Sequence, residues 1–309
     1  MTEISHREAI SEGLRLEMNR DPSVVCVQAA GRDSALAARL DELFGSERVL
    51  TLDPADRTVI GVAVGMALEG ARPVCEVPAA ELPSRGLDQL AEAAELHGRG
   101  GADVPLVVRV PCGYSATGVN DPDDPERWLL SIAGLTVVAP ATATDAKGLL
   151  VSAIRSAGPV CFLEHVELYD ELGPVPEGAH QEPIGVARIA RDGSRATVIA
   201  YGSALSAAVR AVDQLDAEIE LLDLRTLMPL DAEAIVESVT RTGKALLIEE
   251  TALFSATARV VTGAIWESAF EHLDAPLRRA SLARAAETGD RTVSRVETII
   301  EACNELLAY

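Results

Sequence analysis

The sequence predicts an α/β protein with two domains, each a mostly parallel sheet flanked by helices. The chain has 309 residues, and single hydrophobic cores rarely grow beyond about 250–300 residues, so two cores are expected. Short apolar runs alternate with amphipathic helical patterns, which is typical of parallel sheets covered on both faces. Only 3% of the residues are aromatic although 48% are hydrophobic. The core is therefore built from aliphatic side chains.

The first half of the chain shows this alternation clearly. Ile10, Leu14 and Met18 recur at helical spacing, which predicts a helix over 5–19 with Ser5 as its N-cap and Glu8 completing a capping box. A near-continuous β-branched run at 105–110 is typical of a strand buried on both faces. The other expected strands are 24–29, 49–52, 72–77, 135–139 and 160–164, and the other expected helices are 33–44, 58–68, 84–97 and 145–156.

A stretch rich in glycine, proline and acidic residues interrupts the alternation before it resumes. We expect a first domain over 1–168, a linker over 169–193 and a second domain over 194–309. The strands expected in the second domain are 196–201, 219–223, 245–249 and 277–282, and its expected helices are 203–215, 231–240, 257–270 and 292–307. Asp231 is the expected N-cap of one of these helices.

Composition and charge exclude several classes of protein. The net charge of −21 repels a phosphate backbone, so we expect no nucleic-acid partner. No run of about 18 apolar residues occurs, so no membrane span is expected, and the first residues carry no secretory pattern. The five cysteines are dispersed without a CxxC pair, and the histidines lack metal-ligand spacing. We therefore expect a cytoplasmic protein with reduced core cysteines and no metal site of its own.

The sequence also lacks the common self-contained catalytic motifs. There is no GxGxxG after a strand, no GxxxxGK[ST] phosphate loop and no GxSxG nucleophile elbow. An enzyme of this size without such a motif often shares its site with another chain.

A series of short strings in fixed order nevertheless resembles a known family. They are residues 7–10 (REAI), 61–65 (GVAVG), 70–76 (GARPVCE), 88–89 (DQ), 109–113 (RVPCG), 134–140 (GLTVVAP), 145–150 (DAKGLL), 223–231 (DLRTLMPLD), 249–250 (EE) and 274–279 (DAPLRR). The chain resembles the beta subunit of the first component of thiamine-diphosphate-dependent 2-oxoacid dehydrogenases, of the pyruvate or branched-chain type. The same two domains, pyrimidine-binding and C-terminal, occur in transketolase.

The resemblance implies where site residues lie. The family carries a glutamate five residues before the first glycine of the 61–65 string, where it binds the aminopyrimidine N1′ of thiamine diphosphate. Asp56 stands at that position, either as the same acid repositioned or as an ordinary charge at a helix N-terminus. Leu82 is the one candidate for the apolar wall against the pyrimidine ring. Asn120 and Asp121 stand where the family has a histidine pair on the substrate or acceptor side.

Several of these positions depart from the family pattern. The family's acidic pair after the first apolar strand is replaced by a run that begins at Gln28, and its aromatic residues after the 72–77 strand are missing. We therefore expect a pocket that has drifted from that of standard pyruvate dehydrogenase.

The resemblance implies partners as well. An alpha-type subunit would share thiamine diphosphate and hold its magnesium in an α2β2 assembly, with self-association through the second domain. An acyltransferase core or an acyl carrier protein is a further expected partner. The expected reaction is 2-oxoacid decarboxylation or ketol cleavage, followed by transfer of an acyl or two-carbon unit. The alternative is a non-catalytic pseudo-subunit that serves as an assembly scaffold.

Overall fold

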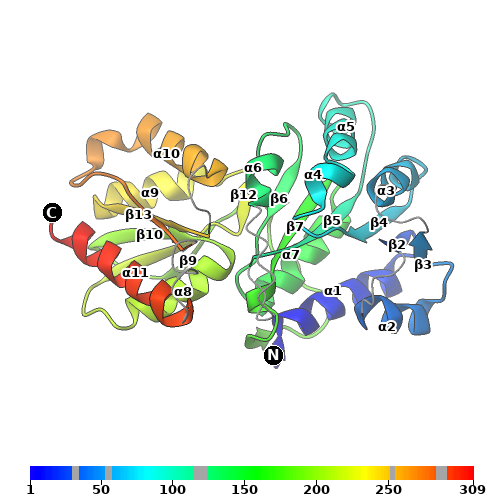
Figure 1. Ribbon diagram of the computed structural model, residues 1–309, viewed down its shortest axis with the longest axis horizontal. Coiled ribbons are helices and arrows are strands. Elements are labelled where there is room, and N and C mark those ends of the chain that lie inside the picture. The colour runs from blue at the N-terminus through cyan, green and yellow to red at the C-terminus, as the bar shows by residue number, and fades with distance from the viewer. Residues whose placement is uncertain (30–34, 53–57, 114–123, 251–254, 283–290) are drawn as a thin grey trace. The chain divides into compact units, whose positions relative to one another are not determined.

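A computed structural model describes residues 1–29, 35–52, 58–113, 124–250, 255–282 and 291–309. The chain divides into two compact units, Met1–Ile184 and Gly185–Tyr309. Both are α/β units with mostly parallel sheets, which confirms the predicted fold class (Figure 1). Among the described residues no helix is long and apolar enough to cross a membrane.

The first unit is built around a parallel sheet. Its strands are β1 (Thr2–Ser5), β2 (Val24–Ala29), β3 (Val49–Leu52), β4 (Arg72–Glu76), β5 (Val107–Cys112), β6 (Thr136–Val138), β7 (Val160–His165) and β8 (Leu172–Val175). The order within the sheet is β6-β7-β5-β4-β2-β3, and every neighbouring pair in it is parallel. β1 and β8 form a separate antiparallel ribbon.

Helices cover both faces of this sheet (Figure 1). They are α1 (His6–Arg20), α2 (Ala35–Phe44), α3 (Val59–Leu68), α4 (Leu82–Arg85), α5 (Leu87–Gly98), α6 (Pro125–Leu129) and α7 (Ala143–Arg155). The apolar stripe of α1 packs with α2 and α7 on one face, in a cluster that includes Ile10, Leu40 and Leu149. Helix α3 packs with α5 on the other face. The predicted capping box of α1 is present, since Ser5 and Glu8 bond each other's backbone N–H groups.

The second unit has the sheet order β14-β13-β10-β11-β9, in which only β9 runs antiparallel to its neighbour. Its strands are β9 (Arg188–Arg191), β10 (Ala196–Ala200), β11 (Ile219–Asp223), β12 (Thr226–Met228), β13 (Ala245–Glu249) and β14 (Arg278–Ser281). Its helices are α8 (Gly202–Val212), α9 (Ala232–Thr242), α10 (Ala256–Ser268) and α11 (Arg291–Leu307). Asp231 caps α9 through the N–H of Ala234, as predicted.

The predicted linker over 169–193 needs correction. Residues up to 184 belong to the first unit, where β8 pairs with β1 and the buried Lys147 donates to the Pro176 carbonyl at 2.7 Å. Residues 185–193 contribute β9 to the sheet of the second unit. Turn-forming residues suggested a linker, but the backbone hydrogen bonds of this stretch are made inside the two units.

Two smaller expectations were also resolved. The helix expected over 84–97 is two helices, α4 and α5, which meet at Gly86 with a φ of 154°. A Cβ at Gly86 would lie 2.6 Å from Ile60 Cδ1, so the break requires glycine. All five cysteines are free and buried, as predicted.

Candidate functional site

The carboxyl ends of the strands define the candidate site of the first unit. In chain order β2 comes first, β3 lies on one side of it and β4 on the other, so the winding direction reverses between β2 and β4. In α/β sheets ligands bind outside the carboxyl ends of strands at such a reversal. The residues at the ends of β2, β4, β5 and β7 are therefore the ones to examine.

The segment after β4 continues alongside β5 and brings Leu82 to this edge. Val77 donates its N–H to the Arg109 carbonyl at 2.9 Å, and Ala79 donates to the Pro111 carbonyl at 3.0 Å. Leu82 then begins α4 and is fully buried. The side chain thus belongs to the apolar floor at the ends of β4 and β5. Its contact with a cofactor stays a prediction.

The other predicted site residues lie outside the described residues. Asp56 falls in 53–57, and Asn120 and Asp121 fall in 114–123. Their roles stay predictions as well. The described chain resumes at α3 after the first of these segments, and β5 with Gly113 leads into the second.

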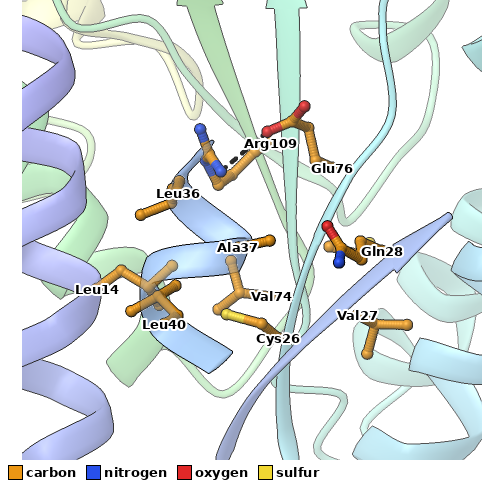
Figure 2. A pocket seen from close by; sticks show the side chains of 11 residues that line it. Leu14, Cys26, Val27, Gln28, Leu36, Ala37, Leu40, Val74, Glu76 and Arg109 are labelled. Carbon is orange, nitrogen blue, oxygen red and sulfur yellow. Dashed lines mark ion pairs between the residues drawn. The ribbon is translucent and has the colours of Figure 1, made fainter. Parts of the chain in front are cut away.

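A buried cluster of charged residues joins β4, β5 and β7 (Figure 2 shows its Arg109–Glu76 side). Arg109 on β5 donates from Nε to Glu164 Oε1 at 2.5 Å and from Nη2 to Glu164 Oε2 at 2.8 Å. Its Nη1 lies 3.0 Å from Glu76 Oε2, and Tyr169 donates its hydroxyl to Glu164 Oε2 at 2.7 Å. The Glu164 side chain has no exposed surface and that of Arg109 is 9% exposed. Three neighbouring strands are therefore held together by charge-assisted hydrogen bonds.

Burial and charge shift the pKa values in this cluster. Burial opposes the charge of Arg109, but the carboxylates Glu164 and Glu76 outweigh it and raise the pKa of the guanidinium. Burial and the charge of Glu164 raise the pKa of the Tyr169 hydroxyl. Nearby, burial lowers the pKa of His6 to about 4 against the charges of Glu164 and Asp145. At neutral pH the cluster therefore holds a charged arginine, a neutral phenol and a neutral imidazole.

Gln28 borders the same edge at the end of β2 (Figure 2). Its Nε2 donates to Thr51 Oγ1 at 3.0 Å, while its Oε1 is buried and has no partner among the described residues. A cavity of about 30 Å³ lies beside Gln28, Glu76 and Arg109. An uncharged amide thus stands next to the carboxylate of Glu76, where the family resemblance implies an acid.

The sequence did not single out the Arg109 cluster. The signal was available, because Arg109 and Glu164 are charged residues inside otherwise apolar strands. A buried charge requires a partner. Which charges pair depends on strand order. β7 lies next to β5 in the sheet although β6 comes between them in the chain, because β6 lies on the far side of β7.

Comparison with known proteins gives the class to which this fold and site belong. Residues 2–171 match the transketolase pyrimidine-binding domain, and residues 185–304 match the transketolase C-terminal domain. The fold is also that of solved structures. A chain described as a split gene transketolase, inactive beta4 tetramer, superposes with a TM-score of 0.78 at 18% identity over 98% of this chain and 99% of that one. Transketolase from Leishmania mexicana gives 0.73 at 16% identity over 100% of this chain and 46% of that one.

Curated relatives narrow the class. The 2-oxoisovalerate dehydrogenase subunit beta of Bacillus subtilis is 36% identical over 90% of this chain and 89% of its own length. The pyruvate dehydrogenase E1 component subunit beta of Staphylococcus aureus is 33% identical over 92% and 91%. The chain belongs to the family of beta subunits of thiamine-diphosphate-dependent 2-oxoacid dehydrogenases, which is built from transketolase-type domains.

The described residues are compatible with the pyrimidine end of thiamine diphosphate. Ala79 and Leu82, which follow β4 at the carboxyl edge, are buried apolar residues. Gln89 on α5 has a buried Oε1 without a partner among the described residues, close to Gly61 of α3. A Cβ at Gly61 would lie 2.8 Å from this oxygen, so a larger residue there would force the Gln89 side chain to shift. In chemical type, these apolar side chains and the unpaired amide oxygen suit an aminopyrimidine.

Proposed function

We propose that this chain is the beta-type component of a two-component thiamine-diphosphate enzyme that decarboxylates a 2-oxo acid or cleaves a ketol. The acyl or two-carbon unit is then transferred to an acceptor. The observation that carries the proposal is the similarity over nearly the whole chain to beta subunits of 2-oxoisovalerate and pyruvate dehydrogenases. The two matched domains cover residues 2–171 and 185–304, so the similarity extends over both units.

In this proposal, residues of the first unit hold the pyrimidine end of the cofactor. Thiamine diphosphate supplies an electron sink for cleavage of the bond next to a carbonyl. Asp56 accepts a hydrogen bond at N1′ and so sets the proton distribution of the aminopyrimidine, while Leu82 forms the apolar wall. Asn120 and Asp121 face the substrate or acceptor. A buried floor excludes water from the pyrimidine and strengthens the hydrogen bond to Asp56.

The pocket differs from that of a standard pyruvate dehydrogenase. An aspartate at position 56 is one methylene shorter than the family's glutamate, and a displacement near 1 Å costs about 100-fold in rate unless the backbone compensates. We infer a specialised substrate or acceptor rather than pyruvate and a standard lipoyl arm. A pocket rebuilt around a different substrate accounts for several changed positions at once.

A partner chain completes the site. This sequence has no phosphate loop for the diphosphate. We propose that an alpha-type subunit holds the diphosphate and its magnesium in an α2β2 assembly. Self-association through the second unit, an acyltransferase core or acyl carrier protein as acceptor partner, and a cytoplasmic location complete the proposal.

The test is a cofactor titration of the assembled complex. The chain is co-expressed with an alpha-type subunit from the same genome, and thiamine diphosphate with magnesium is titrated by calorimetry. Asp56→Ala should weaken binding and reduce turnover by about 100-fold or more, since a positioned acid group typically contributes 10²–10⁴-fold. Asp216→Ala, an exposed acid of the second unit, is the matched control. A complex that assembles but binds no cofactor refutes the proposal.

A second candidate function is the non-catalytic scaffold. One solved protein with this fold is described as an inactive tetramer of beta chains, and the departures at positions 28, 56 and 120–121 remove family groups. In this case the Asp56→Ala substitution would leave the turnover of the assembled complex unchanged. The comparison of this variant with the unaltered chain therefore separates the two functions.

A further inference from the structure

We propose that the cavity between α1 and α2 binds small organic anions, carboxylates or phosphates with an aliphatic body. This α1–α2 cavity has a volume of about 730 Å³ and is bordered by Ile10, Arg15, Leu36, Arg39 and Glu76, among others. Pockets that hold small molecules commonly measure about 300–1,000 Å³. The cavity is therefore of the right size for a small metabolite.

Its place in the topology supports a ligand. The cavity lies over the carboxyl ends of the strands, with Glu76 of β4 and Arg109 of β5 among its lining residues. It thus lies beside the reversal between β2 and β4, where α/β sheets bind ligands. Arg109 is already saturated by Glu76 and Glu164, so the floor is a rigid platform and not the anion-binding group.

The walls are apolar. Ile4 and Ile10, and Leu36, Leu40 and Leu43 of α2, line the cavity. Ile10 and Leu40 are buried in one packed cluster, so the half-buried Ile4 and Leu36 and the exposed Leu43 supply the apolar surface that a ligand can cover. Leu43 is 56% exposed. An aliphatic body lying between these walls removes apolar surface from water, at about 25 cal/mol for each Å² buried.

The charges of the rim select an anion. Arg15 and Arg39 line the cavity, and Arg15 has no ion-pair or hydrogen-bond partner for its side chain among the described residues. The acids of the rim are engaged. Glu8 accepts from Ser5 in the capping box, and these hydrogen bonds and the charge of Arg39 lower its pKa, while Glu12 lies 3.4 Å from the buried Lys147 Nζ. Two guanidinium groups beside apolar walls, in a chain of net charge −21, form a local site for a carboxylate or phosphate.

The test uses three probes of equal aliphatic length with the purified full chain. Hexanoate, hexyl phosphate and uncharged hexanamide are titrated by isothermal calorimetry. We expect at least one anion to bind about tenfold or more tightly than hexanamide, the size of effect that a hydrogen bond to a charged group produces. The two anions distinguish a carboxylate ligand from a phosphate ligand.

The variants test the residues. The double variant Arg15→Met/Arg39→Met keeps aliphatic side chains at both positions. It should bind the anions no more tightly than it binds hexanamide. Arg99 lies just after α5, on the other face of the sheet, and its side chain is 79% exposed. Arg99→Met should leave the anion affinity unchanged. Circular dichroism verifies that each variant is folded. Equal affinity for hexanoate and hexanamide, no anion binding, or full anion affinity in the double variant overturns the proposal.

This titration is independent of the proposed enzymatic function, because it needs neither thiamine diphosphate nor an alpha-type subunit. Failure of cofactor binding in the complex leaves the anion site standing, and failure of anion binding leaves the enzymatic proposal standing.

Discussion

The buried pair Arg109–Glu164 gives the sharpest test of what holds the candidate site together. Replacing Arg109 by Met removes the guanidinium and leaves the carboxylate of Glu164, which has no exposed surface, with only the Tyr169 hydroxyl as a donor among its described partners. Removing one partner of a buried ion pair costs about 3–5 kcal/mol. The variant should therefore lose a large part of the stability of the first unit.

A double variant distinguishes the loss of the ion pair from the cost of the unpaired carboxylate that the single substitution leaves buried. Arg109→Met combined with Glu164→Leu removes both charges and keeps apolar volume between the strands. Replacing a buried ion pair by well-packed apolar residues is often neutral or stabilising. We therefore expect the double variant to be more stable than Arg109→Met alone, although it adds a second mutation.

Scanning calorimetry of the full chain measures both effects. For a domain of about 150–250 residues, 1 kcal/mol changes the melting temperature by about 2–4 °C. The first unit spans Met1–Ile184, so Arg109→Met should lower its transition by about 6–20 °C. A drop of less than about 2 °C, or a double variant that melts lower than the single one, refutes the reasoning, because the cost would then not come from an unpaired buried carboxylate.

Further predictions concern pH and the backbone. Burial lowers the pKa of His6 in the folded state to about 4, so between about pH 6.5 and 4 the unfolded chain binds more protons than the folded chain. Stability therefore falls as the pH drops through this window, by up to about 3 kcal/mol. His6→Gln should reduce the loss of stability between pH 7 and pH 4.5 in melting curves, and an unchanged loss contradicts the prediction. Gly134→Ala should lower the melting temperature, because φ is 86° and the new Cβ would lie 2.7 Å from the Ala94 carbonyl oxygen. Gly65→Ala, in α3 with nothing within 4 Å, should instead stabilise the chain by about 0.5–1 kcal/mol. Equal effects of the two glycine substitutions would show that local geometry does not decide them.

Much of the local structure followed from residue pattern. The period of Ile10, Leu14 and Met18 and the Ser5–Glu8 box predicted α1 within a residue at each end, because helix starts depend on side chains a few positions away. The linker prediction was wrong for the opposite reason. Whether 172–175 is a strand depends on its partner β1, about 170 residues earlier in the chain, and no local pattern reports that pairing.

The candidate site also consists partly of residues that the sequence pointed to and partly of contacts that only the structure revealed. Family strings pointed to Asp56, Leu82, Asn120 and Asp121, and the structure describes Leu82 alone of these, as a buried residue. Sequence reasoning passed over Arg109 because a single charge in a strand does not name its partner. Gln28 was noticed only as a departure from the family, and the structure adds that its Oε1 is buried and that Gln28 lines the same cavity as Glu76.

The sequence by itself determined the two α/β units, their helices and caps, the reduced cysteines and the family, because these depend on short-range spacing and on strings that stay in order. Only the tertiary structure decided where the units divide, which charges meet at the carboxyl edge, and that α1 and α2 enclose an arginine-bordered cavity. The physical reason is that strand order sets these contacts. β2, β4, β5 and β7 become neighbours through long crossover connections, and a residue pattern of period two or 3.6 carries no information about which strand will lie alongside.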